Sequence, residues 1–317
     1  MKKEVISLIV PIYNESEVID ELYSRILKVF EKTEYDFEMV CIDDGSKDDS
    51  LSKLLNLHSK DNRVKVVSFS RNFGKEIAMT AGIEYSSGDY LVPIDADLQD
   101  PPELIFTMME KLKEGYDVVY ATRAKREGES LFKKMTAILF YKIIGRMTSV
   151  PIPPDTGDFR IMKKNAVDAL KSLKEKRRFM KGLFSWVGFN QVSITYQRKP
   201  RFAGKTKWNY WKLWNFALEG ITSFTTIPLR VWTYLGIMIS FISFIYALFL
   251  MFRHFFHGID VPGYNSMMVV LLLLGGIQLL SLGVIGEYIS RIFDEVKERP
   301  LYIVKQSIGF KSIQDEE

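Results

Sequence analysis

The chain has few of the residues that build disulfide frameworks or zinc sites. Its 317 residues include one cysteine, Cys41, and three histidines. A single cysteine excludes an intramolecular disulfide and a multi-cysteine zinc site, and three histidines leave little room for a histidine-based metal centre. A large excess of one charge is also lacking, since 43 Lys and Arg against 39 Asp and Glu give a formal net charge of +4. The composition therefore permits a reducing compartment, and we expect no nucleic-acid partner.

Charge is absent altogether from two long stretches near the carboxyl end. Residues 231–252 and 266–286 contain no Asp, Glu, Lys or Arg. Each stretch has about 20 residues, which as a helix span the roughly 30 Å hydrocarbon core of a bilayer. A pair of buried core helices is the alternative, but core helices of this length normally keep one polar face. The sequence therefore predicts two transmembrane helices joined by a short outer loop.

Basic residues near these stretches predict their orientation. The connecting segment 253–265 holds one Arg and no Lys, whereas both flanks are basic. The basic residues of the flanks are Lys205, Lys207, Lys212 and Arg230 before the first stretch and Arg291, Lys297 and Arg299 after the second. Because cytoplasmic flanks carry the excess of Lys and Arg, we expect a multi-pass protein of the inner (plasma) membrane. Its soluble part and both termini are expected in the cytoplasm.

The residues before about position 227 alternate between strand-like and helix-like patterns. Apolar runs with β-branched residues predict strands at 5–12, 37–43, 63–69, 89–94 and 117–121. Helical periodicity lies between the first two of these runs. Such alternation predicts an α/β fold, Rossmann-like, with a mostly parallel sheet and helices on both faces. Ligands of such sheets bind at the carboxyl ends of the strands.

Acidic residues gather where these strands end. The second predicted strand ends in Asp-Asp-Gly-Ser at 43–46, and the fourth ends in Asp-Ala-Asp at 95–97. Carboxylates at one edge of a sheet repel one another unless a cation lies between them. A divalent ion held by Asp97, with Asp95 and Gln99, relieves that repulsion and can neutralise a diphosphate. Ligands that are all oxygen favour Mg²⁺ or Mn²⁺ over zinc.

Three ordered motifs resemble the signature of family 2 glycosyltransferases, which have the GT-A fold. They are Val-Pro-Ile-Tyr-Asn-Glu at 10–15, Asp-Asp-Gly-Ser at 43–46 and Asp-Ala-Asp at 95–97. The continuation Leu-Gln-Asp-Pro-Pro-Glu at 98–103 is similar to polyprenyl-phosphate sugar transferases, the branch that includes dolichyl-phosphate mannose synthase. Residues 156–160, residues 208–215 and the two apolar stretches resemble bactoprenol glucosyltransferases of the GtrB type. The resemblance covers essentially the whole chain.

The resemblance implies a role for each matching residue. The family's positions for the base and ribose of a nucleotide sugar match Pro11, Tyr13, Glu15, Ile42 and Asp44. Its metal and diphosphate positions match Asp95, Ala96, Asp97 and Gln99, and its phosphate-binding arginines match Arg123 and Arg201. The residues expected to bind the phosphate of a lipid acceptor are Arg198, Lys205 and Lys207. Solvated basic residues beside a membrane are an equally good interpretation of these last three.

Asp158 is the residue expected beside the reacting centre, because the resemblance implies that this acid is the catalytic base. A lipid monophosphate has a second pKa of ~6, so its oxygen is largely ionised at neutral pH and hardly needs a base. Asp158 can instead orient Arg160 or another basic group. A structural Asp158–Arg160 pair is the third interpretation. The sequence leaves these roles open.

The implied function is the transfer of a single sugar, with inversion, from a nucleotide sugar to polyprenyl (undecaprenyl) phosphate at the cytoplasmic face of the membrane. UDP-glucose is the expected donor, and GDP-mannose and UDP-N-acetylglucosamine remain open. We also expect a homo-oligomer. A processive polysaccharide synthase is disfavoured, because such enzymes usually carry a Gln-Xaa-Xaa-Arg-Trp element and more spans. A noncatalytic membrane scaffold is disfavoured, because Asp95, Asp97, Arg123 and Asp158 are all retained.

These patterns also predict the domain boundaries. Residues 1–207 form the catalytic domain, with an interfacial helix at about 131–147, and residues 208–228 form a second interfacial helix beside the membrane. Residues 229–290 hold the two transmembrane helices, and residues 291–317 form a cytoplasmic tail. The interfacial helices are expected because a polyprenyl tail stays in the bilayer, so the site must lie at the membrane surface.

Overall fold

The computed structural model describes residues 3–31, 33–124, 153, 156–176, 178–197, 227–257 and 263–310. These residues belong to two compact units, one that holds a β-sheet and one that holds two long helices. The expected interfacial helix at 131–147 and most of the one at 208–228 lie outside the described residues. The same is true of four expected phosphate-binding residues, Arg198, Arg201, Lys205 and Lys207. Their roles stay predictions.

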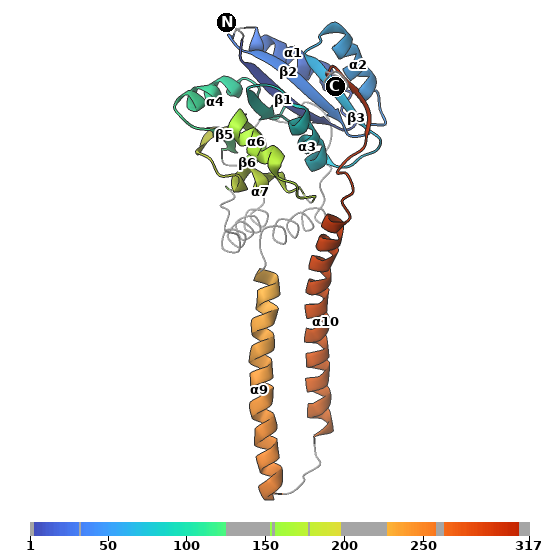
Figure 1. Ribbon diagram of the computed structural model, residues 1–317, viewed down its shortest axis with the longest axis vertical. Helices are drawn as coiled ribbons and strands as arrows, with labels where there is room; N and C mark the ends of the chain where they lie inside the picture. The colour runs from blue at the N-terminus through green and yellow to red at the C-terminus, as the bar shows by residue number, and fades with distance from the viewer. Residues whose placement is uncertain are drawn as a thin grey trace, which may run out of the picture. The chain divides into compact units, whose positions relative to one another are not determined.

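Among the described residues, an eight-stranded sheet forms the centre of the first unit (Figure 1). Its strands are β1 (Val5–Ile12), β2 (Asp36–Asp43), β3 (Val64–Phe69), β4 (Tyr90–Pro93), β5 (Val118–Arg123), β6 (Thr156–Lys163), β7 (Gln191–Tyr196) and β8 (Val304–Ile308). They lie in the order β7-β5-β6-β4-β1-β2-β3-β8. The pairs β1–β2, β1–β4, β2–β3 and β5–β7 are parallel, whereas β6 is antiparallel to both β4 and β5. The expected α/β fold with a mostly parallel sheet is confirmed.

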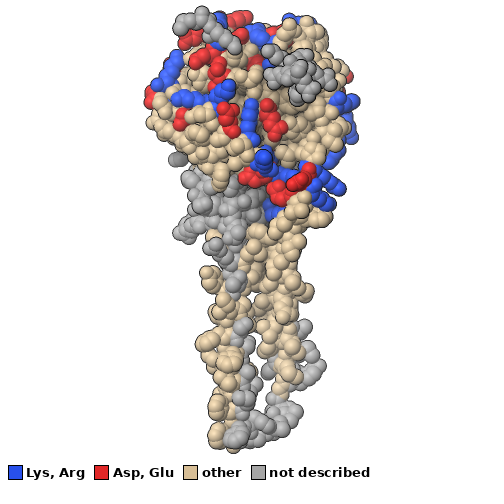
Figure 2. Space-filling view, viewed as in Figure 1, with Lys and Arg blue, Asp and Glu red and all other residues tan. Residues whose placement is uncertain are grey.

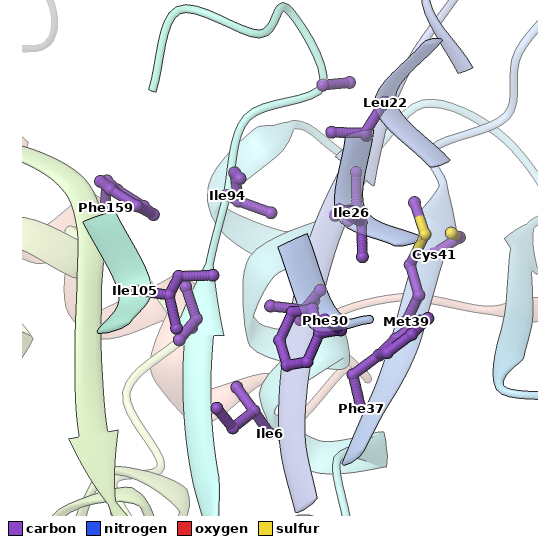
Figure 3. Close-up of a cluster of buried hydrophobic side chains, with 14 of the residues drawn as sticks. Ile6, Leu22, Ile26, Phe30, Phe37, Met39, Cys41, Ile94, Ile105 and Phe159 are labelled. Carbon is purple, nitrogen blue, oxygen red and sulfur yellow. The ribbon is translucent and has the colours of Figure 1, made fainter. Parts of the chain in front are cut away.

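Helices cover both faces of this sheet. They are α1 (Ile19–Phe30), α2 (Ser50–Lys60), α3 (Lys75–Tyr85), α4 (Leu104–Lys113), α6 (Lys164–Ser172) and α7 (Met180–Trp186). On one face, Leu22 and Ile26 of α1 and Ile105 of α4 lie in a single buried cluster with Ile6 of β1 (Figure 3). Because both faces are covered, β1 and β2 are buried over most of their length, as their mostly apolar sequences indicate.

On the opposite face, α3 approaches β1 closely. A Cβ atom added at Gly82 of α3 would lie 2.0 Å from Cγ2 of the buried Ile9 in β1. No packed pair of carbon atoms tolerates that distance, so either Ile9 or the helix must move. Glycine therefore sets the distance between α3 and the sheet, and with it the position of the helix start.

Replacing Gly82 with alanine is expected to destabilise the fold. We expect the free energy of unfolding to fall by about 1–3 kcal/mol, the usual cost of forcing extra volume into a packed core. Thermal or urea unfolding of the purified protein measures the change. Ser52→Ala, on an exposed position of α2, is the control and should leave stability nearly unchanged. A Gly82→Ala protein as stable as the wild type would contradict the close packing of α3.

The eighth strand is not expected from the sequence. Within the segment 291–317, expected to be a tail, the second long helix continues to Val296 and residues Val304–Ile308 form β8. β8 is antiparallel to β3 and lies at the edge of the sheet (Figure 1). A five-residue run that mixes polar and apolar side chains resembles a polar loop, so its pattern alone does not reveal it. The chain that follows the two long helices therefore returns to the sheet.

The second unit consists of α9 (Ile227–His257) and α10 (Tyr264–Val296). Within the described residues, one stretch, Leu273–Val296 of α10, is long and apolar enough to cross a membrane, and Tyr234–Tyr246 of α9 is a shorter apolar stretch. Large apolar side chains of both helices are exposed, as at Tyr234 (70%) and Leu279 (72%). Figure 2 shows almost no charged side chain over most of the visible length of these helices. That both helices span a bilayer stays a prediction.

Candidate active site

The site residues expected from the sequence lie at the carboxyl ends of the parallel strands. Asp44 directly follows β2, and Asp95 and Asp97 follow β4. Asp158 lies near the beginning of β6, which is antiparallel to β4 and β5, so the beginning of β6 lies beside the ends of those strands. The topology of the sheet therefore brings Asp95 and Asp158 together at the carboxyl ends of the parallel strands.

Lys75 joins these two carboxylates. Its Nζ lies 2.6 Å from Oδ1 of Asp95 and 2.7 Å from Oδ2 of Asp158. Lys75 is the first residue of α3, and Gly74 before it has a φ of 101°, a backbone conformation that glycine adopts readily. Sequence reasoning missed Lys75, because a lysine at the start of a helix carries no pattern of its own. The available signal was the cluster of carboxylates, which requires a nearby cation.

The cations around Asp158 keep its carboxylate ionised. Burial alone raises the pKa of Asp158, but the charges of Lys75, Lys181 and Arg160 outweigh burial and hold the pKa well below its usual range. For Lys75, burial acts to lower the pKa, but Asp158 and Asp95 outweigh it and raise the pKa above its usual value. For Lys181, burial prevails over the nearby carboxylates, and the pKa is lowered. Asp158 is therefore a fixed negative charge among cations.

Arg160 contacts the backbone beside Asp158 rather than its carboxylate. Its Nε donates to the carbonyl oxygen of Asp158 (3.2 Å), and its Nη2 donates to that of Gly157 (3.0 Å). The guanidinium also lies 3.8 Å from the centroid of the Phe184 ring. Burial lowers the pKa of Arg160 to about 10. These contacts do not support the interpretation of Asp158–Arg160 as a structural side-chain pair, since Lys75 holds the carboxylate instead.

A second carboxylate, that of Glu76, lies close to Asp158. It accepts a hydrogen bond from the backbone N–H of Met180 (3.1 Å), which joins the start of α3 to the start of α7. Burial, and after it the negative charge of Asp158, raises the pKa of Glu76. Sequence reasoning missed this residue as well, because a Glu in the first turn of a helix is ordinary. Glu76 holds α7, which carries Lys181, beside the site.

The expected metal ligands lie together but do not complete a site by themselves. Oδ1 of Asp97 accepts a hydrogen bond from the backbone N–H of Gln99 (3.1 Å), in a turn where Leu98 has a φ of 58°. Asp95 forms the ion pair described above, and Ala96 is buried between the two acids. Among the described residues, no group of three His, Cys, Asp or Glu side chains is placed to hold a metal ion. A cation here needs further ligands, which the phosphates of a donor can supply.

Asp44 is held by the β3–α3 loop (residues 70–74). Its two carboxylate oxygens accept hydrogen bonds from the backbone N–H groups of Phe73 (2.6 Å) and Gly74 (2.9 Å). Burial raises the pKa of Asp44, although these two hydrogen bonds oppose it. Gly45, with a φ of 68°, lies so near the loop that a Cβ there would be 2.5 Å from the carbonyl carbon of Arg71. Asp44 and Gly45 therefore fix the loop that leads into α3.

The other residues expected to bind base and ribose lie near Asp44. Pro11 and Ile42 are register partners across β1 and β2. Tyr13 and Glu15 follow β1 directly, and the backbone N–H of Glu15 donates to Oγ of Ser50 (2.9 Å) at the start of α2. The sheet thus gathers the five residues of this set at the ends of two neighbouring strands.

Arg123 ends β5 with one nitrogen unused. Its Nε is buried and has no hydrogen-bond partner among the residues that the structure describes, and the same holds for Oδ1 of Asp158. Its Nη2 lies 3.3 Å from the position that a Cβ on Gly157 would take. The hydroxyl of Tyr196 donates to the buried Asp100; burial and Asp100 raise the pKa of Tyr196 to about 12, although the nearby Arg123 opposes them. Unpaired buried atoms of this kind are available to a ligand.

The chain is similar to known proteins in both sequence and structure. Residues 7–171 match the family model described as Glycosyl transferase family 2, and residues 227–292 match the one described as GtrB C-terminal hairpin. The chain is 54% identical to an uncharacterised glycosyltransferase of Synechocystis, over 96% of each chain. It is 47% identical to the SfII prophage-derived bactoprenol glucosyl transferase of Shigella flexneri, over 95% of this chain and 98% of that protein. A crystal structure of glucosyl-3-phosphoglycerate synthase from Mycobacterium tuberculosis aligns with a TM-score of 0.49 and 19% identity, over 69% of this chain and 77% of that chain.

Proposed function

The chain belongs to the family 2 glycosyltransferases, and we propose that it transfers a single glucose from UDP-glucose to a polyprenyl phosphate at the membrane surface. The observation that carries this proposal is the similarity to a bactoprenol glucosyl transferase over nearly the whole length of both chains. The geometry of the site supports it, because an ionised carboxylate, a partly unpaired arginine and further acids lie at one edge of the sheet. Transfer of a sugar from a nucleoside diphosphate needs charged groups that align the substrates and neutralise the leaving diphosphate.

The donor lies across the ends of β1, β2 and β5. Tyr13 and Asp44, with the residues gathered around them, bind the base and ribose. The diphosphate extends toward Arg123, whose unpaired Nε donates to one of its oxygens. Arg201, outside the described residues, is the second phosphate-binding arginine. The sugar then lies beside Asp158, near the ammonium group of Lys75.

In the reaction, an oxygen of the lipid phosphate attacks the anomeric carbon of the glucose. The bond that forms joins this carbon to the lipid phosphate oxygen. The bond that breaks joins it to the β-phosphate oxygen, which leaves with the electron pair as part of UDP. Attack opposite the leaving group inverts the anomeric configuration. No proton has to move when the acceptor is fully ionised, and its second pKa is ~6.

Asp158 acts as a positioning charge rather than as a base. A carboxylate whose pKa is held below its usual range is a poor proton acceptor, because proton transfer is efficient when the pKa of the base lies near the operating pH. Its charge instead fixes Lys75 by a 2.7 Å ion pair and attracts the ammonium of Lys181. These cations lie where negative charge of the two phosphates accumulates. Alignment and charge neutralisation therefore supply most of the rate gain.

Mg²⁺ or Mn²⁺ is the cofactor. Asp95, Asp97 and Gln99 provide oxygen ligands. The ion pair between Asp95 and the ammonium of Lys75 shows that a cation can lie beside one of these ligands. Two carboxylates with substrate phosphates are a usual environment for Mg²⁺. When bound, a divalent ion supplies neutralisation of the charge that develops on the leaving diphosphate. Asp97 is the residue on which this binding depends most.

The two long helices anchor the enzyme as a membrane hairpin. Both α9 and α10 cross the bilayer, with the catalytic unit and both termini in the cytoplasm and Arg198, Lys205 and Lys207 near the acceptor phosphate. The match to the GtrB C-terminal hairpin over residues 227–292 and the exposed apolar side chains support this topology. The protein resides in the inner membrane as a homo-oligomer.

A donor panel tests the proposed function. The purified full-length protein is incubated with a short-chain polyprenyl phosphate, Mg²⁺ or Mn²⁺, and one nucleotide sugar at a time, and the lipid product is identified by mass. UDP-glucose is expected to add one hexose per lipid. Transfer from GDP-mannose or UDP-N-acetylglucosamine alone contradicts the proposed donor. A polymeric product favours a processive synthase, and no transfer from any donor favours a noncatalytic scaffold.

A further inference from the structure

The segment after the two long helices forms a strap along the edge of the sheet. This C-terminal strap (residues 301–310) contains β8, which pairs with β3 from Ile308 opposite Val66 to Val304 opposite Phe69 (Figure 1). The register shifts between Ser68 and Phe69, where β3 ends. An irregularity of this kind re-aims the side chains beside it. The strap therefore meets the sheet where the β3–α3 loop begins.

Tyr302 fastens the beginning of the strap. Its ring stacks on that of Phe69, with the centroids 4.8 Å apart and the planes 21° from parallel. Its hydroxyl donates a hydrogen bond to the carboxylate of Glu84 near the end of α3. Beside it, the backbone N–H of Ser70 donates to the carbonyl oxygen of Ile303 (3.0 Å). One residue of the strap thus contacts both the strand before the β3–α3 loop and the helix after it.

The contacts continue from Phe69 into the loop that holds Asp44. The ring of Phe69 packs edge-on against Phe73, with the centroids 5.6 Å apart. The guanidinium of Arg71 covers Phe73, 4.3 Å from its centroid. The backbone N–H of Phe73 is one of the two donors to Asp44. An unbroken series of contacts therefore runs from Tyr302 through Phe69 and Phe73 to Asp44.

We infer that Tyr302 is a positioning residue for the donor. It holds the β3–α3 loop in place, and the loop in turn keeps the carboxylate of Asp44 in its orientation and Lys75 at the start of α3. The inference rests on the proposed function in taking Asp44 to lie at the donor's base. It assigns a role to a residue in a segment otherwise expected to be a tail. It also makes the C-terminal strap part of the donor site, although the backbone donors to Asp44 belong to the β3–α3 loop and not to the strap.

Two substitutions of Tyr302 and a control in the same strap test this inference in the full-length protein. Tyr302→Ala removes both the stacking and the hydrogen bond, whereas Tyr302→Phe keeps the stacking on Phe69. Phe310→Ala is the matched control, because Phe310 packs on Tyr85, 4.9 Å between centroids, at the other end of the strap. Binding of UDP in the presence of Mn²⁺ is measured by calorimetry, and hydrogen exchange is measured over residues 70–76.

Tyr302→Ala is expected to weaken UDP binding about tenfold, the scale of losing one aromatic stacking contact. It should raise the KM for the donor without changing the KM for the lipid, and speed exchange at the amides of Phe73 and Gly74. Tyr302→Phe and Phe310→Ala are expected to stay within about twofold of the wild type, because the stacking on Phe69 persists in both. If Tyr302→Ala does not fold, Tyr302→Leu replaces it, with an expected loss of about threefold.

Unchanged UDP binding and unchanged exchange at residues 70–76 in a folded Tyr302→Ala protein overturn the inference. An equal loss in Phe310→Ala also overturns it, because the strap then only stabilises the sheet. If the wild type itself does not bind UDP, the proposed donor is wrong. The exchange measurement then decides alone whether Tyr302 clamps the loop.

Discussion

Replacing Asp158 with asparagine is expected to lower kcat by about 10²-fold, the scale on which misplacing groups at a reacting centre acts. Asparagine has nearly the same shape but no charge. Lys75 then loses one of its two carboxylate partners, and the negative charge near Lys181 is reduced. Transfer of glucose to a short-chain polyprenyl phosphate measures the effect. Activity of the asparagine variant close to that of the wild type would remove Asp158 from the reacting centre.

The pH dependence of a second variant, Lys75→Met, tests whether Lys75 sets the charge of Asp158. In the wild type the depressed pKa keeps Asp158 ionised from about pH 5 to about pH 8. Asp158 therefore causes no loss of activity toward the acidic end of this range. Without Lys75, burial is opposed by fewer cations, and the pKa of Asp158 rises. The variant should therefore lose activity as the pH falls through this raised value.

The ratio of Lys75→Met activity to wild-type activity is the quantity to plot. Titration of the acceptor phosphate, near pH 6, affects both proteins and cancels in the ratio. A ratio that falls toward low pH supports control of Asp158 by Lys75. A ratio that stays constant across the range would show that Lys75 acts through Asp95 or the substrate instead.

Replacing Asp97 with alanine is expected to lower transfer by about 10³-fold, because several kcal/mol of charge stabilisation on the leaving diphosphate is lost. The protein should remain folded and bound to the membrane, since Asp97 lies in a turn outside the buried strands. Addition of a chelator should reduce the wild type to a similar level, and Mg²⁺ or Mn²⁺ should restore it. Sugar incorporation and thermal unfolding are both measured.

Asp20→Ala is the matched control for Asp97→Ala. Asp20 is an exposed acid of α1 that pairs with Lys53 at 2.7 Å and is not one of the residues expected to bind the donor or the metal ion. Exposed pairs of this kind contribute little to stability, so the control should behave like the wild type. Full activity of Asp97→Ala in the presence of chelator would remove the metal ion from the proposed mechanism.

The first five strands and the acids at their ends could be predicted because their signals are local. A buried strand such as Val5–Ile12 is a mostly apolar run, and the acids of residues 43–44 and 95–97 lie at or just after the ends of such runs. β6 contains Gly157 and Arg160 and is held by pairing with strands far back in the chain. β8 likewise depends on pairing with β3. Pairings between distant segments leave little trace in a short window of sequence, so these strands were not predicted.

The candidate site could be predicted as a set of carboxylates but not as a network of charges. The expected acids do lie at one edge of the sheet, yet the cation between Asp95 and Asp158 is a lysine of the protein. The carboxylate of Asp44, expected to face a ligand, accepts hydrogen bonds from backbone N–H groups of the β3–α3 loop. Both contacts depend on where α3 begins, and the packing of Gly82 against β1 fixes that position. Residue type alone does not carry this information.

The return of the chain to β3 after α10 makes the order of synthesis matter. The ribosome produces α9 and α10, the proposed membrane hairpin, before it produces Tyr302 and β8, so these helices are complete while the sheet still lacks its last strand. If the strap holds the β3–α3 loop in place, the nucleotide sugar is bound well only after both helices of the proposed anchor have been made. A chain cut short before Tyr302 is then expected to bind the nucleotide sugar about tenfold more weakly, as the Tyr302→Ala variant is.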